Sequence, residues 1–157
     1  MFQRELLMET KADQLNQRIA ILLADDDHQV CSAMRLILEQ ESEIQVVGEV
    51  FDGETLLDLL SVSCKGTKDN GGNTTANSIK EPEHFVLLLD WELPGFSPVE
   101  EISHLRATFP ELIVVALSVQ TEARQVALAS GVDAFVSKSD PPDQVMAKLR
   151  ALVPITN

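Results

Sequence analysis

The hydrophobic pattern of the chain contains three unbroken apolar runs, at residues 19–24, 85–89 and 112–117. Runs of this length that end at polar or turn residues are typical of strands buried on both faces, as in a parallel sheet. Residues 44–50 alternate only partly between apolar and polar side chains, which indicates a strand nearer the sheet edge. Residues 133–137 predict a short final strand.

Segments with apolar residues at helical spacing separate these predicted strands. The apolar positions that define them are Val30, Ala33, Met34, Ile37 and Leu38 in the first helix, Leu56, Leu57, Leu59 and Leu60 in the second, Val99, Ile102, Leu105 and Phe109 in the third, Val126 and Ala127 in the fourth, and Val145, Met146, Leu149, Leu152 and Val153 in the fifth. We expect all four residues of the third set to point inward.

Local signals mark several helix ends. The first helix should run to about Glu41, Pro110 should stop the third, and Gly131 should end the fourth in the left-handed conformation. The fifth should begin with Asp140 as its capping acid and a proline in its first turn.

Five strands that alternate with five helices imply right-handed crossovers and a parallel sheet covered on both faces, which is an α/β fold. The predicted domain covers residues 19–153. Residues 1–18 have loosely helical spacing and should form a marginal helical extension. Residues around 62–82 are small and polar and should form a flexible insert, and residues 154–157 should form a short tail.

Composition limits the classes of function. The chain has 157 residues, of which 45% are hydrophobic and 24% charged, as in one globular domain. Its formal net charge of -13 argues against direct nucleic acid binding and favours partners with an apolar or basic surface. The chain lacks a signal-peptide core and a long uncharged apolar stretch, so we expect a soluble cytoplasmic protein without a membrane segment.

The cysteines and histidines give no sign of a metal site. Cys31 and Cys64 have no CxxC spacing, and the three histidines form no ligand pattern with them. We expect a reduced intracellular chain without zinc, with Cys31 as a core or boundary thiol.

Four of the five predicted strands end in a polar residue. Asp25 and Asp26 follow the first strand, and Asp90, Ser118 and Lys138 end or follow three others. Because the carboxyl ends of parallel strands meet at one edge of the sheet, these side chains should surround one crevice.

This set of groups fits phosphoryl transfer to a carboxylate. Asp90 would be the nucleophile towards phosphorus, and Asp25 and Asp26 would bind Mg²⁺ through oxygen. Ser118 would donate a hydrogen bond to one phosphoryl oxygen, and Lys138 would pair with another.

Each of these residues also has a structural interpretation. The acids at 25–27 could form a solvated turn, although three acids are too many for one helix cap, and Asp90 or Ser118 could cap the helix that follows. Lys138 could be a surface lysine. The joint placement at successive strand ends is what favours the functional interpretation.

At these residues the chain resembles the receiver domain of two-component response regulators, from about Ile19 to Val153. Leu-Leu-Ala-Asp25-Asp26-Asp27 resembles the acidic pair of that family, and Leu-Leu-Asp90-Trp-Glu-Leu-Pro-Gly its phosphoacceptor turn. Ala-Leu-Ser118 resembles its hydroxyl strand, and Phe-Val-Ser-Lys138 its lysine strand.

The resemblance implies a flavodoxin-like (βα)5 sandwich of three layers with strand order 2-1-3-4-5. It implies a magnesium site formed by Asp25, Asp26, Asp90 and the backbone carbonyl of Glu92. It also implies a phosphoacceptor that assists its own phosphotransfer and dephosphorylation rather than an enzyme. The phosphodonor would be a histidine kinase or histidine phosphotransfer protein. An unknown output protein would bind the surface of the fourth helix, fifth strand and fifth helix, and homodimerisation is left open.

Phe135 is the candidate switch residue. A phosphoryl group on Asp90 should draw the Ser118 hydroxyl inward, and the Phe135 ring can then occupy the space behind the fourth strand. The alternative is a permanently buried core aromatic.

The sequence departs from the family pattern at several positions. Ser118 replaces a commoner threonine, which keeps the hydroxyl, and Val119 replaces a small residue, which should narrow access to Asp90. Ser139-Asp140-Pro141 resembles regulators with a helix-turn-helix output domain, but with the sequence ending at Asn157 we expect no such domain. The insert lengthens the connection into the third strand.

Two other functions stay open at this stage. A pseudo-receiver would act as an interaction module without phosphorylation. A phosphatase of the haloacid dehalogenase type would use Asp25 and Asp27 as nucleophile and acid, but Gln29 does not match that family and a cap domain has no room.

Overall fold

The computed structural model describes residues 19–63 and 82–153. The secondary structure of this part consists of β1 (Ile19–Ala24), α2 (His28–Leu38), β2 (Ile44–Val50), α3 (Gly53–Ser63), β3 (His84–Asp90), α4 (Pro98–Thr108), β4 (Ile113–Ser118), α5 (Ala123–Ser130), β5 (Ala134–Ser137) and α6 (Pro142–Leu152). The predictions for residues 1–18, for the greater part of the insert and for residues 154–157 lie outside the described residues. None of the described helices is long and apolar enough to cross a membrane.

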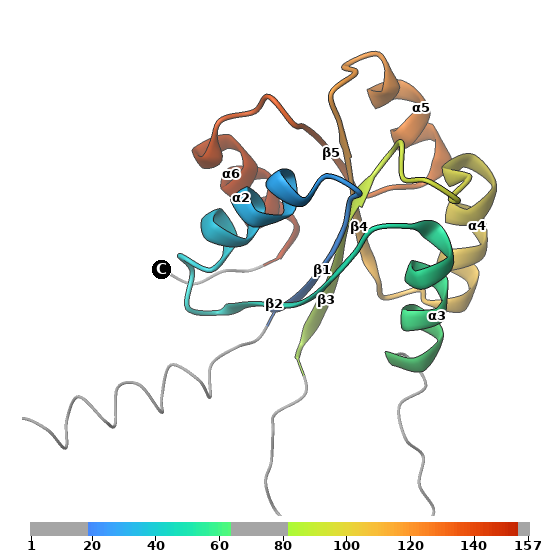
Figure 1. Ribbon diagram of the computed structural model, residues 1–157, viewed down its shortest axis with the longest axis horizontal. Helices are drawn as coiled ribbons and strands as arrows, with labels where there is room; N and C mark the ends of the chain where they lie inside the picture. Colours follow the sequence, from blue (N-terminus) through green and yellow to red (C-terminus); the bar gives the residue numbers. More distant parts are fainter. Residues whose placement is uncertain (1–18, 64–81, 154–157) are drawn as a thin grey trace, which may run out of the picture.

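The strands form one parallel sheet in the order β2-β1-β3-β4-β5 (Figure 1). The predicted α/β fold and strand order are therefore confirmed. The strands β1, β3 and β4 lie inside the sheet and are almost wholly buried, as their unbroken apolar runs predict. The strand β2 lies at an edge, and its partly alternating burial fits that position.

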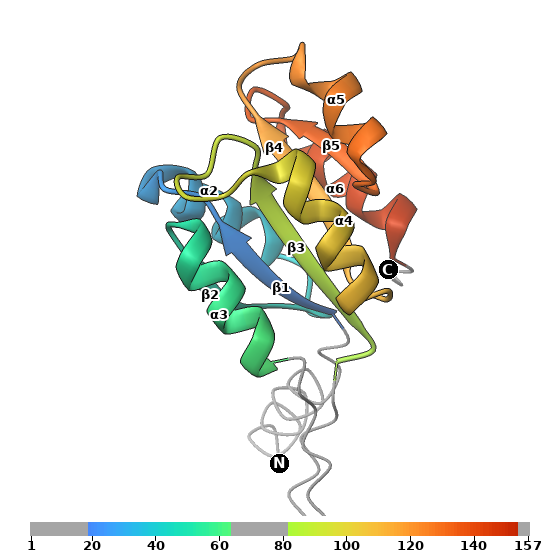
Figure 2. The ribbon, with the colours of Figure 1, turned by 90° about the vertical axis from the view of Figure 1, so that its right-hand side faces the viewer.

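The helices cover both faces of the sheet and make three layers. The helices α2 and α6 lie on one face, and α3, α4 and α5 lie on the other (Figures 1 and 2). Each face has its own hydrophobic core, because alternate residues of every strand point to opposite sides. The carboxyl ends of the strands, where loops lead into the helices, are left at one edge.

Helix α2 ends earlier than predicted. It begins at His28, because the Asp27 side chain accepts hydrogen bonds from the backbone N–H groups of Gln29 and Val30. One of the three acids is therefore a helix cap. The helix ends at Leu38 rather than near Glu41.

Four of the apolar residues that define the predicted helices are exposed, namely Ala33, Leu59, Val99 and Val126. Ala33 in α2 is exposed because the buried residues of that helix, Cys31, Met34 and Leu38, form a stripe on another side. Val99 in α4 is 57% exposed. At 3.6 residues per turn, Val99 lies about 90° from the centre of the stripe that faces the core.

The ends of the last two helices are partly as predicted. Gly131 follows α5 with a φ of 108°, in the left-handed conformation, as expected. The capping residue of α6 is Pro141 rather than Asp140. The Asp140 carboxylate instead accepts hydrogen bonds from the Ser137 backbone N–H (3.1 Å) and from Lys148 Nζ (2.8 Å). It therefore fixes the turn between β5 and α6, which carries Lys138.

Candidate functional site

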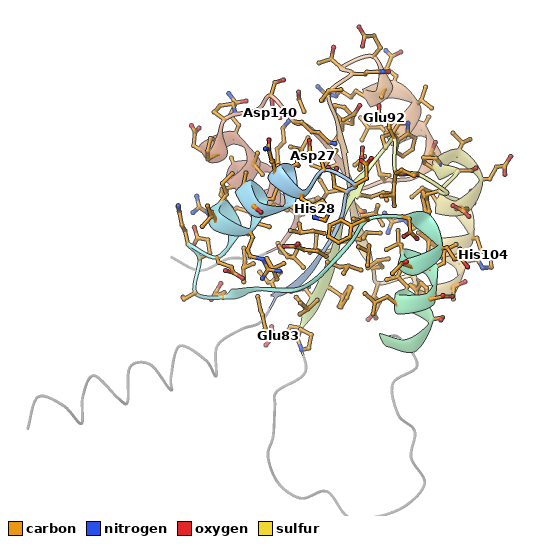
Figure 3. All side chains as sticks on the ribbon, in the orientation of Figure 1. Asp27, His28, Glu83, Glu92, His104 and Asp140 are labelled. Carbon is orange, nitrogen blue, oxygen red and sulfur yellow. The ribbon has the colours of Figure 1, made fainter. Side chains whose placement is uncertain are left out.

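The residues predicted at the strand ends meet at the carboxyl edge of the sheet. Asp25 follows β1, Asp90 ends β3, Ser118 ends β4 and Lys138 follows β5. In Figure 3 the labelled side chains of Asp27, Glu92 and Asp140, which are near neighbours of these residues in sequence, lie toward that edge. The parallel topology places the four strand ends together, as the sequence predicts.

Three carboxylates form the centre of the site. Asp25, Asp26 and Asp90 each offer one oxygen, and these oxygens all lie within 4.8 Å of one another. Asp25 and Asp90 are only 2% exposed, whereas Asp26 is exposed to solvent. The site therefore has two buried acids and one acid at its mouth.

Lys138 is the cation that pairs with the two buried acids. Its Nζ lies 2.7 Å from Asp25 Oδ2 and 3.3 Å from Asp90 Oδ1. Burial acts to lower the pKa of the Lys138 ammonium, but the close contacts with the negatively charged Asp25 and Asp90 together raise it. Lys138 therefore remains protonated at neutral pH.

Asp90 has an unusual ionisation. Burial is the largest influence and, with the negative charge of Asp25, raises the pKa of the Asp90 carboxyl to about 7. The Glu92 backbone N–H, 3.1 Å from Asp90 Oδ1, and the Lys138 ammonium oppose this rise. Without a further cation the site thus stabilises a partly protonated Asp90 near neutral pH.

The donor atoms fit a hard divalent cation. The cluster consists of carboxylate oxygens alone, which are the ligands that Mg²⁺ prefers. The fully buried Asp25 Oδ2 makes an ion pair with Lys138 but accepts no hydrogen bond of suitable geometry from the described residues. It therefore keeps a lone pair available for a ligand.

A turn after β3 brings one more carboxylate to the site. The Trp91 backbone N–H donates to the Leu117 carbonyl at 2.7 Å, and Gly95 closes the predicted Pro-Gly turn with a φ of 73°. From this turn, Glu92 Oε1 accepts a hydrogen bond of 2.7 Å from the hydroxyl of Ser118. The sequence analysis missed this contact, because no local pattern links residues 26 positions apart.

Comparison with protein families identifies this arrangement. The family model described as response regulator receiver domain matches residues 21–150. The chain belongs to this family. The resemblance expected from the motifs is therefore confirmed.

Several response regulators are similar to this receiver chain. The phosphate regulon transcriptional regulatory protein PhoB of Escherichia coli (strain K12) is 26% identical over 137 residues, which cover 85% of this chain and 51% of that protein. The response regulator UvrY of the same strain is 26% identical over 136 residues, which cover 85% and 54%. The receiver chain thus spans about half the length of the curated relatives that it matches.

Solved structures give the same fold. RcsB from Salmonella enterica serovar Typhimurium, bound to a promoter in the presence of the phosphomimetic BeF3-, matches with a TM-score of 0.65 and 25% identity over 86% of this chain and 60% of that one. A DNA-binding response regulator of the LuxR family from Staphylococcus aureus matches with a TM-score of 0.63 and 16% identity over 85% and 97%. The second similarity supports the fold alone.

Phe135 and Val119 are the remaining candidate residues of the receiver. Phe135 in β5 is 8% exposed and packs in the core beneath α3, α4 and α5, so the ring points inward. Val119 follows Ser118 and is 64% exposed. The switching role of Phe135 and the role of the Glu92 carbonyl as a metal ligand stay predictions.

Proposed function

We propose that this receiver domain accepts a phosphoryl group on Asp90 and thereby changes a protein-interaction surface. The observation that supports this function best is the combination around Asp90 of two further carboxylates and the Lys138 ammonium. Asp90 is the buried acid that contacts the ammonium and also ends the central strand of the sheet.

The transfer is a substitution at phosphorus. Among the described residues, the polar contacts of the Asp90 side chain are made by Oδ1, which leaves Oδ2 to attack. A bond forms between Oδ2 and phosphorus, and the bond from phosphorus to the donor histidine nitrogen breaks. The electron pair of that bond stays on the nitrogen, so the histidine leaves neutral after proton uptake from solvent. Lys138 and the Ser118 hydroxyl can then stabilise charge on the phosphoryl oxygens.

Asp25, Asp26 and Asp90 would hold Mg²⁺, with the Glu92 carbonyl as a further ligand. A bound metal would supply positive charge, so that an anionic phosphodonor could approach the three carboxylates. Other groups of the chain position the reacting residues. Asp25 orients the ammonium of Lys138 at 2.7 Å, and the Glu92 backbone N–H orients Asp90.

The proposed partners follow from this chemistry. A histidine kinase or histidine phosphotransfer protein would supply the phosphoryl group in the cytoplasm. An output protein would bind the surface of α5, β5 and α6, and Ser118 and Phe135 would change that surface after phosphorylation. PhoB and RcsB are regulators of transcription or bind promoters. For this chain, with a formal net charge of -13, we propose a protein partner rather than DNA.

A labelling experiment tests the proposed function. The protein is incubated with Mg²⁺ and acetyl phosphate, and its intact mass is measured. Wild type should gain the mass of one phosphoryl group, and Asp90→Asn should gain none. Asp27→Asn is the matched control, because Asp27 caps α2, and it should be labelled like wild type.

Two outcomes would contradict the proposal. Label on Asp90→Asn at the wild-type level would show that Asp90 is not the acceptor. An unlabelled wild type would favour the pseudo-receiver instead. The dehalogenase-type alternative is less well supported, because the Asp27 carboxylate, its second acid, caps α2 through Oδ1.

A further inference from the structure

The hydroxyl of Ser118 is already in use before any phosphoryl group is present. Ser118 is fully buried, and its Oγ donates to Glu92 Oε1 at 2.7 Å while it accepts from the Gln120 backbone N–H at 3.0 Å. Glu92 is an exposed residue of the turn after β3, and its carboxylate reaches inward to this buried group. Figure 3 shows Glu92 at the carboxyl edge of the sheet.

A serine hydroxyl carries one proton and can therefore donate one hydrogen bond. In the proposed function that proton goes to a phosphoryl oxygen on Asp90. The same proton cannot serve Glu92 at that moment, so the bond between Ser118 and Glu92 has to break. Because the acceptor is a carboxylate, this bond is stronger than one between two neutral groups.

We propose that Glu92 is an autoinhibitory latch, which holds the Ser118 hydroxyl away from the phosphoryl site until a phosphodonor displaces it. This inference rests on the proposed function of Asp90. The latch acts in two ways. It occupies the proton that Ser118 would donate, and it brings a fourth negative charge to a site that already contains Asp25, Asp26 and Asp90.

The latch joins two elements that carry different tasks. Glu92 belongs to the turn that follows the phosphoacceptor, and Ser118 ends β4, next to the loop into α5. The bond therefore fixes the end of β4 in its unphosphorylated position. Because Glu92 lies on an exposed turn, its replacement should leave the core intact and the protein folded.

Kinetics of labelling test the latch. The initial rate of labelling by acetyl phosphate at saturating Mg²⁺ is measured for wild type, Glu92→Ala, Glu92→Gln, Ser118→Ala and the double variant of Glu92→Ala with Ser118→Ala. Glu92→Ala should be labelled about three- to tenfold faster than wild type, because it removes one charge-assisted hydrogen bond at a partly exposed site. The labelling rate of Glu92→Gln should lie between those of wild type and Glu92→Ala, since the glutamine amide oxygen still accepts a hydrogen bond but carries no charge.

The double variant separates the latch from charge alone. If Glu92 acts through the hydroxyl, Glu92→Ala should accelerate labelling less in the Ser118→Ala background than in the wild-type background. Glu122→Ala is the control for charge, because Glu122 is exposed and its side chain makes no capping hydrogen bond to α5. It should leave the rate near the wild-type value.

The outcomes separate the latch from the function on which it rests. If wild type is labelled and Glu92→Ala is labelled at the same rate or more slowly, the latch is overturned and the proposed function still stands. An equal acceleration in both Ser118 backgrounds overturns it too, because the effect would then be one of charge. Absence of label on all variants overturns the proposed function. As a readout without phosphate, the unfolding free energies of wild type, Glu92→Ala, Ser118→Ala and the double variant should show coupling between Glu92 and Ser118, and additivity would overturn the latch.

Discussion

Burial decides the ionisation of Asp90 more than its charged neighbours do. Lys138 lies 3.3 Å away and favours the ionised form, yet the pKa of the Asp90 carboxyl rises to about 7. The main reason is the burial of the carboxyl, and the negative charge of Asp25, which lies 2.7 Å from the Lys138 ammonium, adds to the rise. One ammonium thus serves two buried carboxylates, and it does not outweigh the effect of burial on Asp90.

This raised pKa predicts that Asp90→Asn stabilises the metal-free protein at high pH. Folded Asp90 binds a proton below about pH 7, whereas in the unfolded chain it does so only below about pH 4. Between these values the folded state binds more protons, so its stability falls as the pH rises. The advantage of the Asn variant over wild type should therefore grow by about 2 kcal/mol from pH 5 to pH 8.

Urea unfolding in EDTA at the two pH values measures this difference. Two other carboxylates also make the stability depend on pH: hydrogen bonds from Thr55 lower the pKa of Asp52, and the bond to Lys148 lowers that of Asp140. Both proteins contain these groups, so their contributions cancel in the difference between the variant and wild type. A constant difference between the two proteins at pH 5 and pH 8 would contradict the assignment.

At the scale of the elements, two loops hold the site together by close backbone contact. The Gly53 backbone N–H at the start of α3 donates to the Pro94 carbonyl at 2.7 Å, which links α3 to the turn after β3. A Cβ atom at Gly53 would lie 2.4 Å from the Gly95 carbonyl oxygen and 2.8 Å from Phe96 Cβ. The turn that carries Glu92 is therefore supported by a position that has room only for glycine.

Gly53→Ala should destabilise the fold by about 1–3 kcal/mol, the usual range for overpacking, although alanine is the better helix former. The atoms it would meet are mainly backbone, which cannot move aside alone. Gly48→Ala is the matched control, because its Cβ would meet only the end of the Leu22 side chain, at 3.3 Å. Thermal unfolding of both variants measures the effect, and an equal loss in the two would show that the contact at Gly53 is unimportant.

Most of the strands, but not all of the helix caps, could be predicted from the sequence. The buried runs of β1, β3 and β4 and the polar residue at each strand end were predictable, because period and burial are local properties of the chain. The helix caps were less so. Asp27 caps α2 and Asp140 does not cap α6, although both are acids before a helix, because Lys148 and the turn after β5 compete for Asp140.

Contacts between distant residues were not predictable from one sequence. The bond between Ser118 and Glu92 depends on how the turn after β3 folds over the end of β4, and composition carries no sign of it. The exposure of Val99 depends on the rotation of α4 against the sheet. Both features follow from tertiary packing rather than from local pattern.

At the scale of the whole molecule, a hydrogen-bond network stabilises the edge of the sheet where the strands begin, which is the amino edge. At the amino edge, Arg106 of α4 donates through Nε to the Gly131 carbonyl at 2.9 Å and also contacts the Leu112 carbonyl and Asp133. Asp133 in turn accepts from the Val114 backbone N–H at 2.8 Å. This network fixes α4, α5, β4 and β5 to one another at that edge. A change in Ser118 would therefore be expressed mainly at the carboxyl edge, around Val119 and the start of α5.

The charge of the whole chain makes the acidic edge sensitive to metal. The chain has a formal net charge of -13, and the two buried acids of the site share the single Lys138 ammonium, while Asp26 extends the cluster to its mouth. Three carboxylates and one ammonium leave an excess of negative charge, which Mg²⁺ would offset. A ligand that binds only the folded state stabilises it, by about 1.4 kcal/mol at ten times its dissociation constant.

We therefore expect Mg²⁺ to raise the melting temperature by about 3–6 °C at such a concentration. The fluorescence of Trp91, the only tryptophan, should change over the same range of metal concentration because Trp91 follows Asp90.

Asp26→Asn should weaken both responses, since it removes the ligand at the mouth of the cluster. Asp27→Asn should keep both, because residue 27 caps α2 and asparagine caps equally well. A titration of the three proteins with Na⁺ at matched ionic strength, followed by the same two signals, separates metal binding from screening. Equal responses to the two cations, or an Asp26→Asn response as large as that of wild type, would remove the acidic cluster as the metal site.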